Sequence, residues 1–142
     1  MNKVLVVAGA ILLSSIFTSA QTTGERIPHK VVIQLASSDT LVWKGLLNNI
    51  RNLKAGWGDS VAIEVVVHGP GIGFLMKEKT TQPDRITDFK SKGVVFVACE
   101  NTLIEKKISK DSIIPEAGFV KSAVVEIILK QEQGWSYIKS GF

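Results

Sequence analysis

The chain has 142 residues, of which 45% are hydrophobic and 21% charged, and its formal net charge is +4. This length and composition are typical of a single globular domain and exclude a disordered chain. The basic residues are scattered, and Lys106 and Lys107 form the only adjacent basic pair. We therefore expect neither a nucleic-acid partner nor an anionic-membrane partner.

Residues 1–20 have the layout of a signal peptide. Lys3 precedes an apolar run from Val4 to Leu13, and the segment that follows ends in the small residues Thr18, Ser19 and Ala20. The apolar run is shorter than the roughly 20 residues that a membrane-spanning helix needs. We expect cleavage after Ala20 and a mature domain, residues 21–142, that is exported to the periplasm and leaves the membrane. The alternative is an uncleaved N-terminal anchor.

Short, nearly continuous apolar runs predict strands that are covered on both faces, as in a parallel sheet. The predicted strands are Lys30 to Ala36, Val61 to Val67, Val94 to Ala98, Ala117 to Lys121 and Trp135 to Lys139. Glu64 interrupts the second run. We therefore expect that strand to lie nearer the edge of the sheet.

Apolar residues at helical spacing alternate with these strands. The predicted helices are Thr40 to Lys54, a short one around Phe74 to Lys77, Thr81 to Lys92, one directly behind Cys99, and Ala123 to Gln131. Thr102 and Glu105 fit a capping box, which predicts that the helix behind the cysteine is capped by Thr102. The pattern indicates a single α/β domain, a three-layer sandwich with a mostly parallel five-stranded sheet.

Three predicted strand ends bring polar groups to the carboxyl edge of the sheet, where ligands bind in open α/β folds. They are Ser37-Ser38-Asp39, His68-Gly69 and Cys99-Glu100-Asn101. Cys99 is the only cysteine, so it has no internal disulfide partner. A nearby helix N-terminus favours its thiolate, whereas the Glu100 carboxylate opposes it. The alternative is that Cys99 is a buried packing residue.

The remaining candidates are His68 and the glycine-rich loop that follows it. His68 is either a proton acceptor near Cys99 or a structural residue. The loop, with Gly69 and Gly71, allows a tight turn and exposed backbone N–H groups. It lacks the third spaced glycine and the acidic partner of a dinucleotide site. Two histidines and one cysteine give no metal-ligand spacing, so we expect no metal and no cofactor.

Three segments carry a resemblance to a known family. The stretches VVVHGPGIGFL, GVVFVACENTL and EIILKQEQGWSYIKSGF resemble the DsrE/DsrF-like proteins, and the similarity covers His29 to Phe142. The resemblance implies a compact, flavodoxin-like α/β sandwich that assembles as trimers or hexamers. In the sulfur-relay members a cysteine after the equivalent strand carries sulfane sulfur as a persulfide. Cys99 matches that position.

The expected function is therefore an exported sulfur carrier. Cys99 would accept and donate sulfane sulfur, with backbone donors near Asn101 and Thr102 holding the anion. A single cysteine cannot resolve its own mixed disulfide, so the chain needs a donor or acceptor protein or a small thiol. The signal peptide separates it from the cytoplasmic tRNA-modification and sulfite-reductase partners of known relay members. Two alternatives are a non-catalytic small-ligand-binding module and an oligomeric structural subunit.

Overall fold

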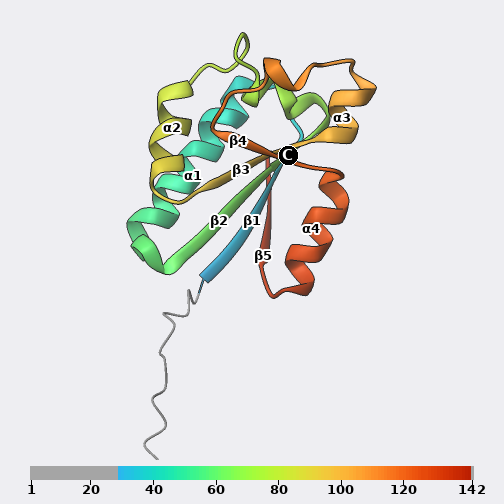
Figure 1. Ribbon diagram of the computed structural model, residues 1–142. Coiled ribbons are helices and arrows are strands. Elements are labelled where there is room, and N and C mark those ends of the chain that lie inside the picture. The colour runs from blue at the N-terminus through green and yellow to red at the C-terminus, as the bar shows by residue number, and fades with distance from the viewer. Residues whose placement is uncertain (1–28, 142) are drawn as a thin grey trace, which may run out of the picture.

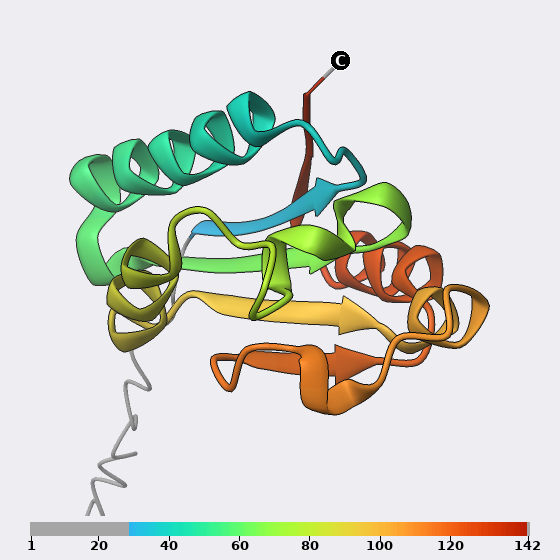
Figure 2. The same cartoon turned by 90° about the horizontal axis from the view of Figure 1, so that it is seen from above.

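The structure is a computed structural model that describes residues 29–141, so the predicted signal peptide lies outside the described residues. Five strands form one sheet in the order β4-β3-β2-β1-β5, and all four pairings are parallel (Figure 2). The strands are β1 (His29–Leu35), β2 (Val61–Val67), β3 (Val95–Cys99), β4 (Ala117–Val120) and β5 (Ser136–Ser140). The predicted single-domain α/β fold with a parallel five-stranded sheet is confirmed.

Four α-helices connect the strands, with 3₁₀ helices between them. They are α1 (Thr40–Trp57), α2 (Pro83–Ser91), α3 (Glu100–Glu105) and α4 (Ala123–Glu132), and the longest 3₁₀ helix is η2 (Gly69–Leu75). Figure 1 shows α1 and α2 on one side of the sheet and α4 on the other. Within residues 29–141, no helix is long and apolar enough to cross a membrane.

The two faces of the sheet have cores of unequal size. On the α1 and α2 side, a large cluster includes Trp43, Phe74 and Phe96. On the α4 side, the cluster consists of six buried residues: Val32, Val66, Val97, Cys99, Ala123 and Ile127. Cys99 therefore belongs to the smaller core, at the carboxyl end of the strands.

Strand β2 lies in the middle of the sheet, so the prediction that it lies near the edge is wrong. Glu64 is tolerated there because its Oε2 pairs with Lys130 Nζ on α4, at 2.6 Å. The same ammonium lies 3.5 Å from Glu126 and stacks over the Trp135 ring at 4.5 Å. A charged residue in an apolar run thus indicates a buried ion pair here.

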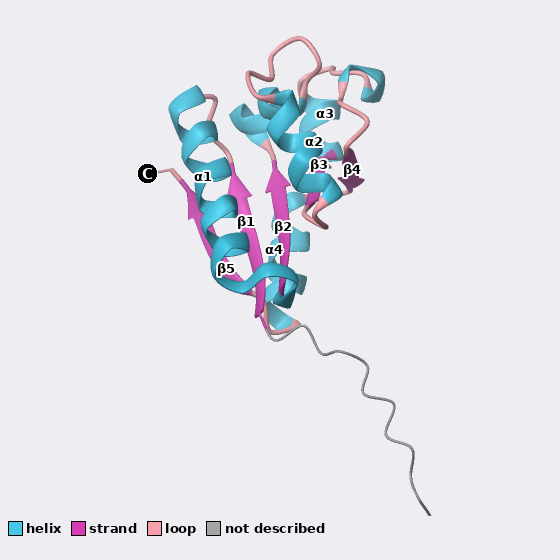
Figure 3. Ribbon diagram, turned by 90° about the vertical axis from the view of Figure 1, so that its left-hand side faces the viewer, coloured by secondary structure: helices cyan, strands magenta, loops and turns pink. Residues whose placement is uncertain are grey.

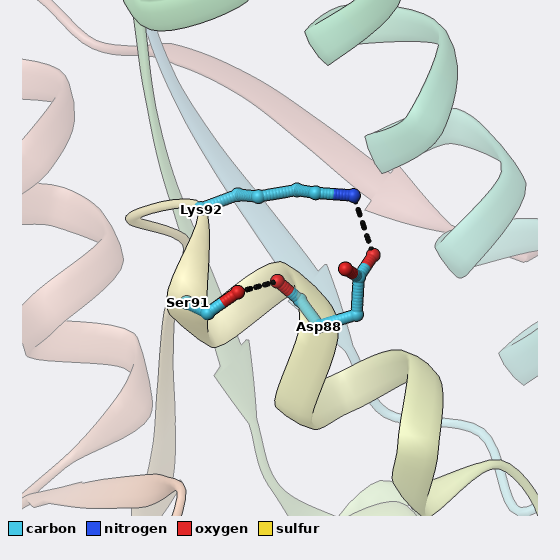
Figure 4. A network of polar contacts seen from close by, with 3 residues as sticks. All are labelled: Asp88, Ser91 and Lys92. Carbon is cyan, nitrogen blue, oxygen red and sulfur yellow. Dashed lines mark hydrogen bonds and ion pairs between the residues drawn. The ribbon is translucent and has the colours of Figure 1, made fainter.

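Helix α2 ends in a small surface network that is remote from this buried pair (Figure 4). The Ser91 hydroxyl donates to the Asp88 carbonyl at 2.7 Å, and Lys92 Nζ lies 2.7 Å from Asp88 Oδ2. Both charged side chains are about half exposed. Exposed pairs of this kind contribute little to stability, about 0.3–0.5 kcal/mol on a helix.

Candidate functional site

The candidate site lies where the chain paths diverge beyond the carboxyl ends of the strands. Figure 3 shows the arrowheads of β1, β2 and β5 at one end of the sheet, with loops gathered beyond them. Cys99 ends β3 and is paired in register with Val120 of β4. The chain leaves β4 for α4, on the opposite face from α1 and α2. Such a divergence is where open α/β sheets bind ligands.

Cys99 is only 4% exposed, and hydrogen-bond donors surround its sulfur. The Ala123 N–H, at the start of α4, donates to Sγ at 3.3 Å. Burial raises the pKa of Cys99, but the Ala123 N–H and the nearby polar hydrogens of Thr102 and Asn101 outweigh it. The net result is a pKa below the ordinary value of 9.0. The surroundings therefore favour the thiolate, which is the nucleophilic form.

Thr102 has a different role from the predicted cap. Helix α3 begins at Glu100 with Cys99 at its N-cap position, so the prediction that Thr102 caps this helix is wrong. Thr102 is buried inside the first turn, and its Oγ1 accepts the Gly69 N–H at 3.0 Å. The Thr102 hydroxyl thereby connects the end of β2 to the cysteine.

The structure uses the backbone N–H groups of the glycine loop internally. The Gly69 N–H donates to Thr102, and the Gly71 N–H donates to the His68 carbonyl at 3.0 Å. The expectation that Gly69 and Gly71 expose free donors is therefore wrong. The predicted short helix around residues 74–77 is instead η2, which starts at Gly69 and buries residues 71–75.

Gly71 is needed for close packing. A Cβ on Gly71 would lie 2.6 Å from the Leu35 carbonyl oxygen, whereas a Cβ on Gly45 would meet nothing within 4 Å. We expect Gly71→Ala to destabilise the protein by about 1–3 kcal/mol, because the backbone must move. Gly45→Ala, within helix α1, should stabilise it by roughly 0.5–1 kcal/mol. Thermal unfolding of both variants tests this, and equal effects would contradict it.

His68 lies next to Cys99 in the register of the sheet. Val67 pairs with Ala98, so continuing the register by one residue brings His68, the first residue after β2, level with Cys99. His68 is extended (φ −151°, ψ 174°), and its Nε2 lies 2.7 Å from Gln34 Nε2. Burial lowers the pKa of His68 below 6.5. The ring is thus held in place as a neutral group.

The two residues that follow the cysteine are engaged with other partners. The Asn101 N–H donates to the Lys121 carbonyl at 3.2 Å, which ties α3 to the end of β4. The Glu100 carboxylate pairs with Lys110. The causes of the pKa shift of Cys99 are burial and the hydrogen-bond donors of Thr102, Ala123 and Asn101.

Two surface pockets flank the site. One of about 410 Å³ adjoins the cysteine and is lined by Asn101, Val120, Lys121, Ser122, Val125 and Glu126. The other, of about 490 Å³, lies over the glycine loop and includes Gly69 and Lys106. Cys99 contacts the first through its neighbours Asn101 and Val120. The loop from Gly69 to Gly73 and the cysteine therefore adjoin different pockets.

Three contributions to the site were not predicted from the sequence. The Ala123 N–H reaches Cys99 from 24 residues away, and Gln34 and Tyr137 form a hydrogen-bonded pair beside His68. Gln34 interrupts the apolar run from Val31 to Leu35 of β1, which is the signal that would have marked it. Among residues 29–141, no group of His, Cys, Asp and Glu side chains is arranged to hold a metal ion.

The structure is thus that of an α/β protein with a parallel sheet. The inner strand β3 of this sheet ends in a single, hydrogen-bonded cysteine. The chain belongs to the DsrE/DsrF-like family, whose model matches residues 18–140. No curated protein matches the chain.

Similar solved structures support the same fold. A protein of unknown function, MTH1491 from Methanobacterium thermoautotrophicum, is 32% identical with a TM-score of 0.74, and the match covers 78% of this chain and 98% of that one. BT1422 from Bacteroides thetaiotaomicron, a conserved protein of unknown function, is 15% identical with a TM-score of 0.64, over 81% and 97%. The ychN protein from E. coli is 12% identical with a TM-score of 0.60, over 78% and 97%. The last two show the fold alone.

Proposed function

We propose that this protein is an exported sulfur carrier that accepts and donates sulfane sulfur through Cys99. Membership of the DsrE/DsrF-like family supports a sulfur-relay role. The observation that carries the proposal is the group of hydrogen-bond donors around the Cys99 sulfur, which lowers the pKa of this thiol despite its burial. The predicted signal peptide is the basis for placing this role in the periplasm.

The proposed reaction needs no cofactor and no external oxidant. The Cys99 thiolate attacks the outer sulfur of a donor persulfide R–S–SH and forms a new S–S bond. The donor S–S bond breaks, its electron pair leaves with the inner donor sulfur, and the proton passes to it. The products are R–SH and Cys99–S–S⁻. Because the chain has one cysteine, an external thiol must take the sulfur away.

The intact mass of the purified protein after exposure to polysulfide tests this proposal. We expect wild type to gain one sulfur atom per chain on Cys99, and a reducing thiol to remove it. Cys99→Ser should gain none. Its hydroxyl can still accept the Ala123 N–H, so the variant should remain folded. Wild type that gains no sulfur, or a variant that gains as much, would contradict the proposal.

We also propose that the chain forms a homo-oligomer, a trimer or a hexamer. The outward face of α4 supports this, because Val124, Val125, Ile128 and Leu129 are each between 44% and 58% exposed. Contiguous exposed apolar side chains of this kind mark interaction surfaces.

Light scattering tests the oligomer. Wild type should have a mass that is a multiple of the chain mass, and Ile128→Lys should reduce it by placing a charge in the interface. Leu41→Lys is the matched control, since Leu41 is 74% exposed and lies on α1. A monomeric wild type would refute the oligomer, and equal effects of both lysines would refute the α4 interface.

A further inference from the structure

A chain of hydrogen bonds crosses three strands and ends at His68. The Tyr137 hydroxyl, on β5, donates to Gln34 Oε1 on β1. The Gln34 Nε2 group lies 2.7 Å from His68 Nε2, just beyond β2. Gln34 and Val66 occupy paired register positions, and Val66 faces α4. The three side chains therefore share the face of the sheet that carries Cys99.

The direction of these hydrogen bonds determines where the proton on His68 lies. The Tyr137 hydroxyl donates to the Gln34 carbonyl oxygen, so the Gln34 amide presents its NH₂ group to the histidine. An NH₂ group only donates, and His68 Nε2 must therefore accept. The ring is then neutral with its proton on Nδ1, and none of the described residues bonds that Nδ1. A neutral ring is also what its buried position favours.

We infer that Tyr137 and Gln34 are positioning residues that hold His68 as the Nδ1–H tautomer, whose N–H donates a hydrogen bond to the outer, anionic sulfur of a Cys99 persulfide. This role rests on the proposed function. It replaces the proton acceptor expected for His68 with a hydrogen-bond donor. Register places His68 beside Cys99, with strands about 4.8 Å apart. Attachment of a second sulfur extends the anion beyond the Cys99 Sγ, towards the space that a neighbouring side chain can reach.

The tautomer is measured first, in the unmodified full chain. Long-range ¹H–¹⁵N spectra distinguish Nδ1–H from Nε2–H, and the chain has two histidines, His29 and His68, which His29→Gln assigns. We expect His68 to be Nδ1–H in wild type and to shift towards Nε2–H in Gln34→Leu and Tyr137→Phe. Gln133→Leu, an exposed glutamine outside this network, should leave the spectrum of His68 unchanged.

The persulfide is measured next, as the fraction of Cys99 that carries sulfur at a fixed ratio of glutathione to glutathione persulfide. The equilibrium constant should fall about tenfold in Gln34→Leu, because a hydrogen bond to an anion is lost. The equilibrium constant should fall less in Tyr137→Phe, because Gln34 remains. Alkylation of the unmodified Cys99 thiol should be unaffected.

The outcomes separate this inference from the proposed function. Wild type that takes up no sulfur contradicts the proposed function, and the donor role falls with it. Wild type that takes up sulfur while His68 is Nε2–H overturns this inference alone. The same holds if the equilibrium constant is unchanged in both variants while their tautomer shifts.

Discussion

Replacing Lys130 with methionine is expected to lower the free energy of unfolding by about 3–5 kcal/mol at neutral pH, because it leaves a buried carboxylate without its counter-charge. Glu64 is 5% exposed, and its Oε1 has no hydrogen-bond partner among the described residues. Lys130 is the only cation within ion-pair distance of Glu64 in residues 29–141. Methionine fills a similar volume, so the loss is electrostatic.

The pKa of Glu64 determines how the stability deficit of Lys130→Met changes with pH. Burial raises the pKa of Glu64 above its ordinary value of 4.5, although the Lys130 ammonium opposes the shift. The folded protein therefore holds this proton more tightly than the unfolded chain. The stability that this group contributes is complete below pH 4.5 and is lost as pH rises through the raised pKa. Protonation also neutralises the orphaned carboxylate, so the deficit of Lys130→Met should shrink in acid.

Urea unfolding of Lys130→Met and of the control Lys92→Met, between pH 4 and 8, measures the effect. Lys92 pairs with Asp88 on the surface, and its loss should cost about 0.5 kcal/mol or less. A deficit in Lys130→Met no larger than that of the control would show that the Glu64 carboxylate is solvated in the folded protein.

Thr102→Val is expected to change both stability and thiol chemistry. It removes the acceptor of the half-buried Gly69 N–H, and the loss of this hydrogen bond should cost about 0.5–1.5 kcal/mol. It also removes a hydroxyl that lowers the pKa of Cys99, so this pKa should rise and the thiolate fraction at pH 7 should fall. Thr102→Ser keeps the hydroxyl and should retain both properties better.

The rate of alkylation of Cys99 against pH reports the second effect. Its inflection should move to higher pH in Thr102→Val and stay near wild type in Thr102→Ser. An inflection that moves equally in both variants would show that loss of the hydroxyl is not the cause of the shift.

Most of the fold could be predicted from the sequence, because buried parallel strands leave nearly continuous apolar runs. VVFVAC is one such run, and it placed Cys99 at the end of a strand. Local sequence patterns gave a wrong prediction where a residue distant in the sequence determines the hydrogen bonding. Thr102 and Glu105 match a capping box, but the Thr102 hydroxyl bonds Gly69, which lies 33 residues away.

The site itself was only partly predictable. The position of Cys99 at a strand end follows from the strand pattern, whereas the groups around it and around His68 come from separate elements. The Ala123 N–H begins α4, and the Tyr137 and Gln34 side chains come from the strands β5 and β1. Which strands are neighbours is not visible in one sequence, so the contacts of Gln34 with His68 and Tyr137 could not be derived before the order β4-β3-β2-β1-β5 was known.

In the proposed carrier, the folded protein makes Cys99 reactive towards sulfane sulfur. The most direct test is the rate of persulfide formation on Cys99 at pH 7, measured for the native protein and for the same chain unfolded in urea. Hydrogen bonds that lower the pKa of Cys99 raise the thiolate fraction in the native state. We therefore predict a native rate at least equal to the unfolded rate. A native thiol that reacts far more slowly, and takes up sulfur only as the chain unfolds, would show that Cys99 is a packing residue and would contradict the proposed carrier.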